Sequence, residues 1–310
     1  MAKIIITGGL GYIGTQLCEL YSKEIKENGH DITIIDNRFL PERVAQLKAW
    51  GMKFIEGDIT DRRFISEIVK DADIIYHLAG ITDVAYTNKD MEFTAEKNAL
   101  IRLTGTHGSR NIIDAMPQTA KIVFPSSHVL FEGLSYQVFD LDENHKPEPR
   151  LAYATSKWET EEDLKNSGKN YIICRLGTNY GIGPSMRLKI VANTFAKLAA
   201  QGKTISMFSG GTNFKSLVSV KDTARCLKFL GENPSINKEI FNCINENLRI
   251  VEIAEICKKF NPNTNITTTN DPIPNEGYTL SNKKLLSTGF EFKYNVHDSI
   301  KEMIDSWKTH

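Results

Sequence analysis

The sequence predicts an α/β fold in which a doubly wound parallel sheet is joined to a smaller C-terminal α/β domain. Three observations support this prediction: short apolar runs alternate with helical patterns over more than half of the 310 residues, a glycine-rich turn follows the first run, and polar residues follow the ends of successive runs. Such alternation implies crossover connections and a sheet covered by helices on both faces.

The first element is a buried strand over residues 3–7, which includes three consecutive isoleucines. It leads into Gly8-Gly9-Leu10-Gly11-Tyr12-Ile13-Gly14, and helical spacing follows until Asn28-Gly29. A second strand over residues 31–36 ends in Asp36. Glycines let the backbone approach a diphosphate, a helix N-terminus offers free N–H groups, and a strand-end acid can bind ribose hydroxyls. The pattern therefore predicts a dinucleotide site.

The glycine spacing is G-x-x-G-x-x-G rather than the commoner G-x-G-x-x-G, so the context carries this prediction. The alternatives are a tight connection without ligand and an acid that only caps its strand. The residues assigned to the cofactor at this stage are Gly8, Gly11, Tyr12, Ile13, Gly14, Asp36, Asn37 and Arg38. An acid here would repel a 2′-phosphate and favours NAD over NADP, whereas Arg38 weakens that preference.

Further strands are predicted over residues 52–58, 72–77, 120–124 and 171–175. In the C-terminal third, helices are predicted over residues 186–201, 220–230 and 251–260, and the Asn- and Thr-rich residues 261–270 are predicted to be a polar connector. Ligands bind beyond the carboxyl ends of parallel strands, so the polar residues that follow these strands should meet at one edge.

Tyr153 and Lys157 are spaced to lie one helical turn apart on one face. A nearby ammonium favours the charged form of a phenol and brings its pKa closer to the range that general acid/base catalysis needs. The same spacing is common on solvated helix faces. The glycine turn elsewhere in the sequence is what favours a catalytic interpretation of the pair.

Together these signals resemble an extended short-chain dehydrogenase/reductase of the NAD-dependent nucleotide-sugar epimerase/dehydratase family. The markers occur in family order: the glycine turn, Asp36, Gly57-Asp58-Ile59-Thr60-Asp61, His77-Leu78-Ala79-Gly80, Ser126-Ser127, Pro149, Tyr153, Lys157, residues 175–181 and residues 217–222. The resemblance implies an NAD-binding Rossmann domain over residues 1–177, with a returning segment near 212–245, and a substrate domain over 178–211 and 246–310. It also implies a homodimer formed by the helices around residues 98–115 and Tyr153.

The resemblance implies roles for individual residues. Asp58 and Ile59 would surround the adenine, and Leu78, Ala79 and Gly80 would lie beside the phosphates and ribose. Tyr153, Lys157 and Ser127 would be catalytic, with Ser126 as the alternative register for the serine. Lys157 would also bind the nicotinamide ribose. Further expected contacts are Asn98 with the cofactor, and Thr82, His128, Thr178, Asn179 and Lys215 with the substrate. His77 is interpreted as a packed side chain.

Several positions depart from the family pattern. Dehydratases carry an Asp-Glu pair where this chain has His128 and Val129, so 4,6-dehydration, and decarboxylation that needs the same glutamate, are disfavoured. Thr178 stands where an Asn is common, and Lys215 where an Arg often binds the diphosphate. Asn98 precedes residues 108–111 by ten positions, an excess of about seven residues or two helical turns, which predicts a longer helix or a bulge at residues 104–108.

Composition sets further bounds. Lys plus Arg equals Asp plus Glu at 38 each, so net charge predicts no nucleic-acid or membrane partner. The five cysteines show no metal-type spacing, and we expect reduced thiols and no metal. No signal peptide or membrane-spanning stretch is recognised, which predicts a cytoplasmic protein.

The favoured hypothesis is an NAD-dependent nucleotide-sugar epimerase that acts at C4 through a transient 4-keto sugar, with Tyr153 as acid and base. The alternatives are an NAD(P)-dependent dehydrogenase or ketoreductase acting on a sugar or small carbonyl compound, and a dinucleotide-binding sensor without catalysis.

Overall fold

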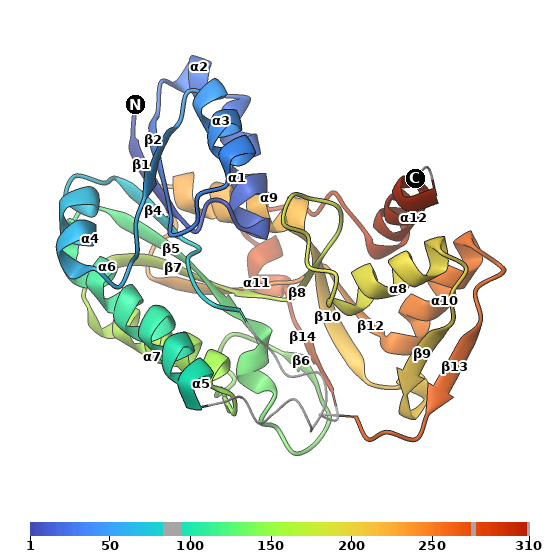
Figure 1. Ribbon diagram of the computed structural model, residues 1–310. Coiled ribbons are helices and arrows are strands. Elements are labelled where there is room, and N and C mark those ends of the chain that lie inside the picture. The colour runs from blue at the N-terminus through green and yellow to red at the C-terminus, as the bar shows by residue number, and fades with distance from the viewer. Residues whose placement is uncertain (83–94, 274–276, 309–310) are drawn as a thin grey trace.

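The computed structural model describes residues 1–82, 95–273 and 277–308, and its main element is a seven-stranded parallel sheet (Figure 1). The strand order is β3-β2-β1-β4-β5-β7-β11, and every neighbouring pair is parallel. The strands are β1 (Lys3–Thr7), β2 (Asp31–Asp36), β3 (Lys53–Glu56), β4 (Ile74–His77), β5 (Lys121–Ser127), β7 (Asn170–Leu176) and β11 (Glu239–Cys243). The predicted fold class is confirmed.

The consecutive isoleucines of β1 explain why both faces of the sheet are covered. Ile4 and Ile6 belong to one buried cluster and Ile5 to another, because successive side chains of a strand point to opposite faces. Buried side chains of α1 (Tyr12–Ser22), α3 (Pro41–Ala49) and α9 (Val220–Glu232) pack in the first cluster. Those of α4 (Arg62–Val69), α6 (Ser109–Ala115) and α7 (Ala152–Asn166) pack in the second. A short helix, α2 (Ile25–Asn28), follows α1.

The remaining elements form smaller sheets and a third buried cluster (Figure 1). This cluster packs α8 (Val191–Ala200), α10 (Ile250–Phe260) and α12 (Val296–Lys308) together. The small sheets are β8 (Thr178–Tyr180) with β10 (Phe214–Ser219) and β12 (Glu246–Arg249), β9 (Ile205–Phe208) with β13 (Ile266–Thr269), and β6 (Val138–Leu141) with β14 (Tyr278–Leu280). The 3₁₀ turn η4 (Ser209–Gly211) and the helix α11 (Lys283–Leu286) complete this part.

Two C-terminal predictions are corrected. The helix predicted to begin at residue 186 begins at Val191, because Pro184 and the left-handed Ser185, with φ of 59°, interrupt regular structure before it. The predicted polar connector contains β13, whose β-branched run pairs with β9 and so forms a strand despite its polarity. No helix within the described ranges is both long and apolar enough to cross a bilayer.

The predicted bulge is a π-helical turn. Residues 103–108 form η2 (Leu103–Gly108), which joins α5 (Ala95–Arg102) to α6 without a break. Gly105 lies so close to α7 that a Cβ there would approach the Ser156 hydroxyl to 2.7 Å. The extra residues are therefore absorbed within the helix, which stays packed against the helix that carries Tyr153.

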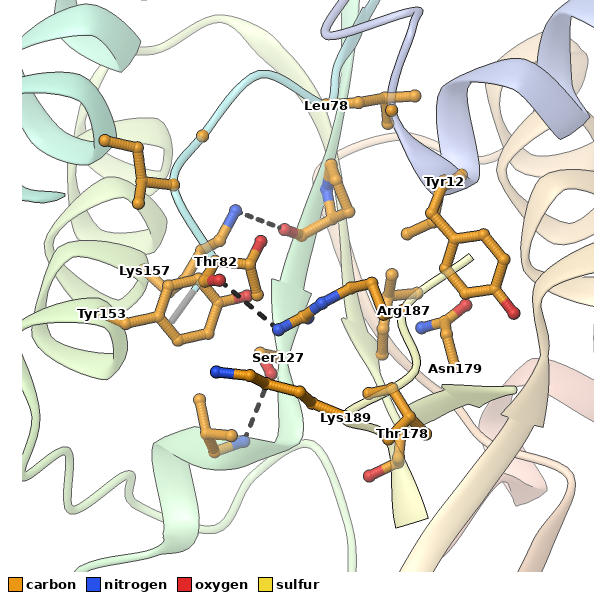
Figure 2. Close-up of a pocket in the computed structure, with 18 of the residues that line it drawn as sticks. Tyr12, Leu78, Thr82, Ser127, Tyr153, Lys157, Thr178, Asn179, Arg187 and Lys189 are labelled. Atoms are coloured by element: carbon orange, nitrogen blue, oxygen red, sulfur yellow. Dashed lines mark hydrogen bonds between the residues drawn. The ribbon is translucent and has the colours of Figure 1, made fainter. Parts of the chain in front are cut away.

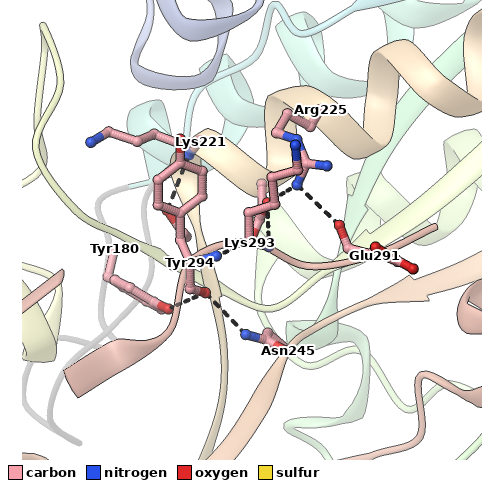
Figure 3. Close-up of polar contacts among 9 residues, drawn as sticks. Tyr180, Lys221, Arg225, Asn245, Glu291, Lys293 and Tyr294 are labelled. Carbon is pink, nitrogen blue, oxygen red and sulfur yellow. Dashed lines mark hydrogen bonds and ion pairs between the residues drawn. The ribbon is translucent and has the colours of Figure 1, made fainter. Parts of the chain in front are cut away.

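Asp222 anchors the segment that precedes the C-terminal helix. Its carboxylate, which is fully buried, accepts backbone N–H groups of Lys293 and Tyr294 at 2.9 Å and pairs with Arg225. Figure 3 shows Arg225 also donating to the Glu291 carbonyl, at 3.0 Å, and Asn245 donating to the Tyr294 carbonyl. These bonds fix α12 relative to α9, so we interpret Asp222 as structural.

A buried ion pair joins α7 to the central sheet. Arg175 on β7 donates from Nη2 and Nε to the two carboxylate oxygens of Glu161 on α7, at 2.8 and 3.1 Å. The side chains are 1% and 0% exposed. Arg175 also donates to the Glu143 carbonyl at 3.1 Å. A bidentate pair fixes orientation as well as distance, and here it holds the helix that bears Tyr153 and Lys157.

We predict that Arg175→Met destabilises the protein by about 3–5 kcal/mol, because it leaves the Glu161 carboxylate buried without its partner. Urea denaturation should show this loss. The double variant Arg175→Met/Glu161→Leu should recover part of it, since both charges are then gone. Lys301→Met, which breaks an exposed ion pair with Asp305, is the control and should change stability little. If Arg175→Met and Lys301→Met destabilised the protein equally, the prediction would be wrong.

Candidate active site

A cavity of about 900 Å³ lies beyond the carboxyl ends of the central strands, a size typical of ligand sites. All but one of the residues predicted for the site line it: Gly8, Gly11, Tyr12, Ile13, Gly14, Asp36, Asn37, Arg38, Asp58, Ile59, Leu78, Ala79, Gly80, Thr82, Ser127, His128, Tyr153, Lys157, Thr178, Asn179 and Lys215. The exception is Asn98, which lies on α5 and is not among the lining residues.

The glycine turn gives one end of the cavity the shape that a diphosphate needs. Gly8 has φ of 70°, and a Cβ there would lie 2.6 Å from the Ala79 nitrogen. A Cβ on Gly14 would lie 2.5 Å from the Gly8 carbonyl oxygen. Gly11 precedes the first turn of α1 and has no side-chain cap. A dinucleotide fits here because the backbone is bare and the N-terminus of α1, with its free N–H groups, lies at the cavity.

Asp36 is held in place at the end of β2. Its carboxylate is 5% exposed and accepts the Leu10 N–H at 3.1 Å and the Arg38 Nε–H at 3.0 Å. Arg38 itself is half exposed. Arg38 therefore occupies the carboxylate oxygens that would bind the ribose hydroxyls.

Helix α7 and the end of β5 bring the catalytic candidates together (Figure 2). Ser127 and Thr82 lie near the Tyr153 hydroxyl, and both lower the pKa of the phenol. The Lys157 ammonium donates to the Pro125 carbonyl at 2.8 Å and lies 5.9 Å from the centroid of the Tyr153 ring. The tyrosine, serine and lysine thus share one wall of the cavity.

Burial sets the protonation of this group. It raises the pKa of Tyr153 above its usual value, against the opposing effect of Arg187, and it lowers the pKa of Lys157 to about 8. The expectation from the sequence was that the Lys157 ammonium lowers the tyrosine pKa. The structure corrects this: desolvation outweighs that effect, and the charge that lowers the Tyr153 pKa is on Arg187.

Arg187 and Lys189 were not predicted from the sequence. They lie in the irregular segment between β8 and α8, and both line the cavity. Figure 2 shows the Arg187 side chain pointing toward Tyr153, and its Nη2 lies 3.4 Å from the Thr82 carbonyl oxygen. The signal that could have found them is a pair of basic residues just after a Gly-Pro turn that follows a strand end.

His128 forms the wall behind Ser127. Its Nδ1 lies 2.7 Å from the Tyr278 oxygen, its Nε2 lies 3.0 Å from the Thr178 hydroxyl, and Tyr278 donates to the His128 carbonyl. Tyr278 has one hydroxyl proton, and it is used in the bond to the His128 carbonyl. The Nδ1–H of His128 must therefore donate to the Tyr278 oxygen, which leaves Nε2 to accept from the Thr178 hydroxyl. Burial lowers the pKa of His128 to about 3, so the ring is neutral.

The model of the NAD-dependent epimerase/dehydratase family matches residues 4–243 of this sequence. The chain belongs to this family. The predicted resemblance is thereby confirmed, and the cofactor of this epimerase/dehydratase-family enzyme is NAD.

Its relatives span several reactions. The dihydroflavonol 4-reductase of Gerbera hybrida is 26% identical, over 98% of this chain and 86% of the relative. The UDP-N-acetyl-alpha-D-glucosaminuronate decarboxylase of Bacillus cytotoxicus is 28% identical, over 82% of this chain and 78% of the relative. The crystal structure of the UDP-glucuronic acid 4-epimerase from Bacillus cereus, with UDP-glucuronic acid and NAD, superposes with a TM-score of 0.82 at 21% identity and covers 99% of each chain. Other relatives include a putative UDP-glucose 4-epimerase of Methanocaldococcus jannaschii, a 4-epimerase of Escherichia coli that acts on an undecaprenyl-diphosphate-linked sugar, and a trifunctional UDP-glucose 4,6-dehydratase of Arabidopsis thaliana.

Within this family site, the remaining predicted residues divide by environment. His77 is fully buried between the Thr7 and Ser109 hydroxyls, at 2.9 and 2.8 Å, which confirms its interpretation as a packed side chain. Ser126 is buried, and its hydroxyl has no partner in the described part of the chain, whereas Ser127 reaches Tyr153. Asn179 binds the Gly177 carbonyl and the Thr223 hydroxyl, so its amide is already engaged.

We predict that Asp36→Asn weakens NAD binding about tenfold to a hundredfold, because ribose hydroxyls then lose a charged acceptor. NADP binding should fall less, since the variant removes a charge that repels a 2′-phosphate and releases Arg38. Calorimetric titration of both dinucleotides measures the two affinities. Glu56→Gln, at an exposed carboxylate beside Asp36 on β3, is the matched control and should leave both affinities unchanged. Unaltered NAD affinity in Asp36→Asn would exclude the ribose role.

Proposed function

We propose that this enzyme is an NAD-dependent nucleotide-sugar 4-epimerase. The observation that carries the proposal is the meeting of Tyr153 with Ser127 and Lys157 in one wall of a cavity whose other end is the glycine turn. A cavity of about 900 Å³ is near the upper end of the range for ligand sites, which suits a long cofactor and a substrate together.

In the proposed reaction, Tyr153 removes the proton from the C4 hydroxyl of the sugar. Ser127 and Thr82 hold the phenol oxygen in line, and Ser127 can also bind the reacting oxygen. The Arg187 charge favours the phenolate that this step needs. The bound NAD supplies reversible acceptance of a hydride.

The resulting 4-keto sugar must turn so that its opposite face is presented for reduction. Tyr153 then returns the proton to the C4 oxygen, and the sugar leaves with inverted configuration and no net oxidation. Lys157, with its amine held by the Pro125 carbonyl, stays beside the phenol in both half-reactions.

The wall next to Ser127 supports epimerisation over dehydration. Val129 has no proton to exchange, and His128 is neutral and bonded at both ring nitrogens. Neither can supply the acid and base that removal of water from C5 and C6 requires. The Asp-Glu pair that dehydratases of the family carry therefore has no counterpart at these two positions, which favours epimerisation.

A second candidate is a ketoreductase or dehydrogenase. It is favoured by the likeness to a dihydroflavonol reductase over 98% of this chain, and by Thr178 and Lys215 at positions where many nucleotide-sugar enzymes carry Asn and Arg. Such an enzyme would release oxidised or reduced product instead of a stereoisomer.

We also propose a homodimer through α5, η2 and α7. Leu100 and Leu103 are 52% and 46% exposed on the first two of these elements, and they support an apolar contact there. A cytoplasmic location remains the expectation from the sequence.

The purified enzyme, saturated with NAD, should interconvert C4 epimers of at least one hexose among UDP-, GDP- and dTDP-linked sugars, including UDP-glucuronic acid. Tyr153→Phe should lower kcat by about 10²- to 10⁴-fold, because proton transfer is lost, while NAD still binds. Tyr136→Phe, at a 64% exposed tyrosine, is the control. Stoichiometric accumulation of oxidised sugar and reduced cofactor, without epimer, would favour the dehydrogenase.

Arg187→Met should shift the acid limb of the kcat–pH profile to higher pH. Arg187 lowers the pKa of Tyr153, so its removal raises that pKa and a higher pH is needed to form the phenolate. Measurement of kcat across the pH range tests this. Lys189→Met removes a neighbouring positive charge that is not among the causes of the Tyr153 shift, so the limb should stay in place. Identical shifts in both variants would contradict a specific effect of Arg187.

A further inference from the structure

Glu132 is an acid in the cavity wall that the proposed C4 chemistry does not use. It directly follows the 3₁₀ turn η3 (His128–Phe131), which begins immediately after Ser127. The residue lines the cavity together with Ser127 and Tyr153. Glu132 was not predicted as a site residue from the sequence, where only His128 and Val129 were considered as proton carriers.

The geometry of the turn places Glu132 on the same edge as Val129. A 3₁₀ helix has three residues per turn, so side chains three positions apart lie one above the other. Both Val129 and Glu132 line the cavity, as this periodicity requires. The carboxyl is thus displaced by one turn from the position where dehydratases of the family carry their glutamate.

The backbone at this position is fixed. The Glu132 N–H donates to the Val129 carbonyl at 3.1 Å, and the Glu148 N–H donates to the Leu130 carbonyl at 2.8 Å. A Cβ on the following residue, Gly133, would lie 2.1 Å from the Glu148 carbonyl oxygen, so this part of the chain is packed tightly against the backbone of Glu148. Glu132 is therefore held at the cavity rather than carried on a free loop.

The carboxyl faces the catalytic groups and has no salt bridge or hydrogen bond to another described residue. Lys215 on β10 lines the same cavity, and its charge lowers the pKa of Glu132, but burial is the larger effect and raises that pKa. The charge of Glu132 in turn raises the pKa of Tyr153 on α7 and of Tyr278 on β14. Its close charged neighbours from the packed elements are thus Lys215 and, when ionised, Tyr153.

We propose that Glu132 is a second proton-transferring residue, which exchanges the hydrogen on a carbon next to C4 of the bound sugar. The inference rests on the proposed function, because only a 4-keto group makes that hydrogen acidic. The proposed step adds a reversible enolisation at C3 or C5 to the C4 epimerisation. Within residues 128–132, Glu132 is the only carboxyl on this edge of the turn, because the position one turn earlier is Val129.

The step balances without an additional reactant. The Glu132 carboxylate takes the proton from the carbon next to the carbonyl, the C–H electron pair forms the C=C bond of an enolate, and the carbonyl electrons move to the C4 oxygen. Lys215 and Arg187 supply positive charge in the cavity for that oxygen. Return of a proton from the neutral Glu132 carboxyl to the same carbon restores the ketone.

The test is turnover in D₂O with UDP-glucose, UDP-N-acetylglucosamine and UDP-glucuronic acid, each followed by NMR of the recovered sugar. The wild-type enzyme should place deuterium at C3 or C5 of the sugar that it epimerises. Glu132→Gln should slow this incorporation at least about tenfold while C4 interconversion continues. The double variant Glu132→Gln/Val129→Glu, with a carboxyl one turn back on the same edge, should restore part of the exchange.

Glu148→Gln is the matched control, because this exposed glutamate adjoins the same turn outside the cavity, and exchange should be unchanged. Epimerisation at C4 without deuterium at either neighbouring carbon would overturn the inference and leave the proposed function intact. Exchange that persists unchanged in Glu132→Gln would also overturn it. If none of the three sugars turns over or reduces the cofactor, the proposed function fails for them, and the inference fails with it.

Discussion

The position of the catalytic helix depends on one buried ion pair. Arg175 and Glu161 join β7 to α7 through two parallel hydrogen bonds in a region closed to water. Tyr153 and Lys157 occupy the first half of the same helix, so the pair fixes their height relative to Ser127 at the end of β5. Placing two charges in the interior is costly, but it limits the ways in which α7 can slide or turn.

The charges of the cavity divide along its length. At the glycine turn the chain offers bare backbone and the clamped Asp36 carboxylate, which suit a dinucleotide. Arg187, Lys189 and Lys215 line the cavity together with Tyr153 and Glu132, so positive charge gathers in the part of the cavity proposed for the substrate. The neutral His128 adds none. This arrangement fits a substrate that carries negative charge and a reaction that builds negative charge on oxygen.

Local patterns in the sequence were sufficient for six of the seven strands of the central sheet, for the glycine turn and for the Tyr153–Lys157 pair, because each depends on spacing along one element; the edge strand β11 was not predicted as a strand. The extra residues near Gly105 could be foreseen as a bulge from helical arithmetic, and they form a π-helical turn. Arg187 and Glu132 could not be foreseen in this way. Their importance comes from segments distant in sequence that close over Tyr153, and the sign of its pKa shift depends on burial that no spacing reveals.

The hydrogen bonds of His128 have an effect on the energy of reaction. The ring is held by Thr178 on one side and by Tyr278 on the other, and it cannot rotate without breaking both bonds. Ser127 is therefore backed by dipoles that already point in fixed directions before any proton moves. Little reorganisation energy remains to be supplied at this wall when charge develops on the substrate oxygen, whereas water in the same place would have to reorient.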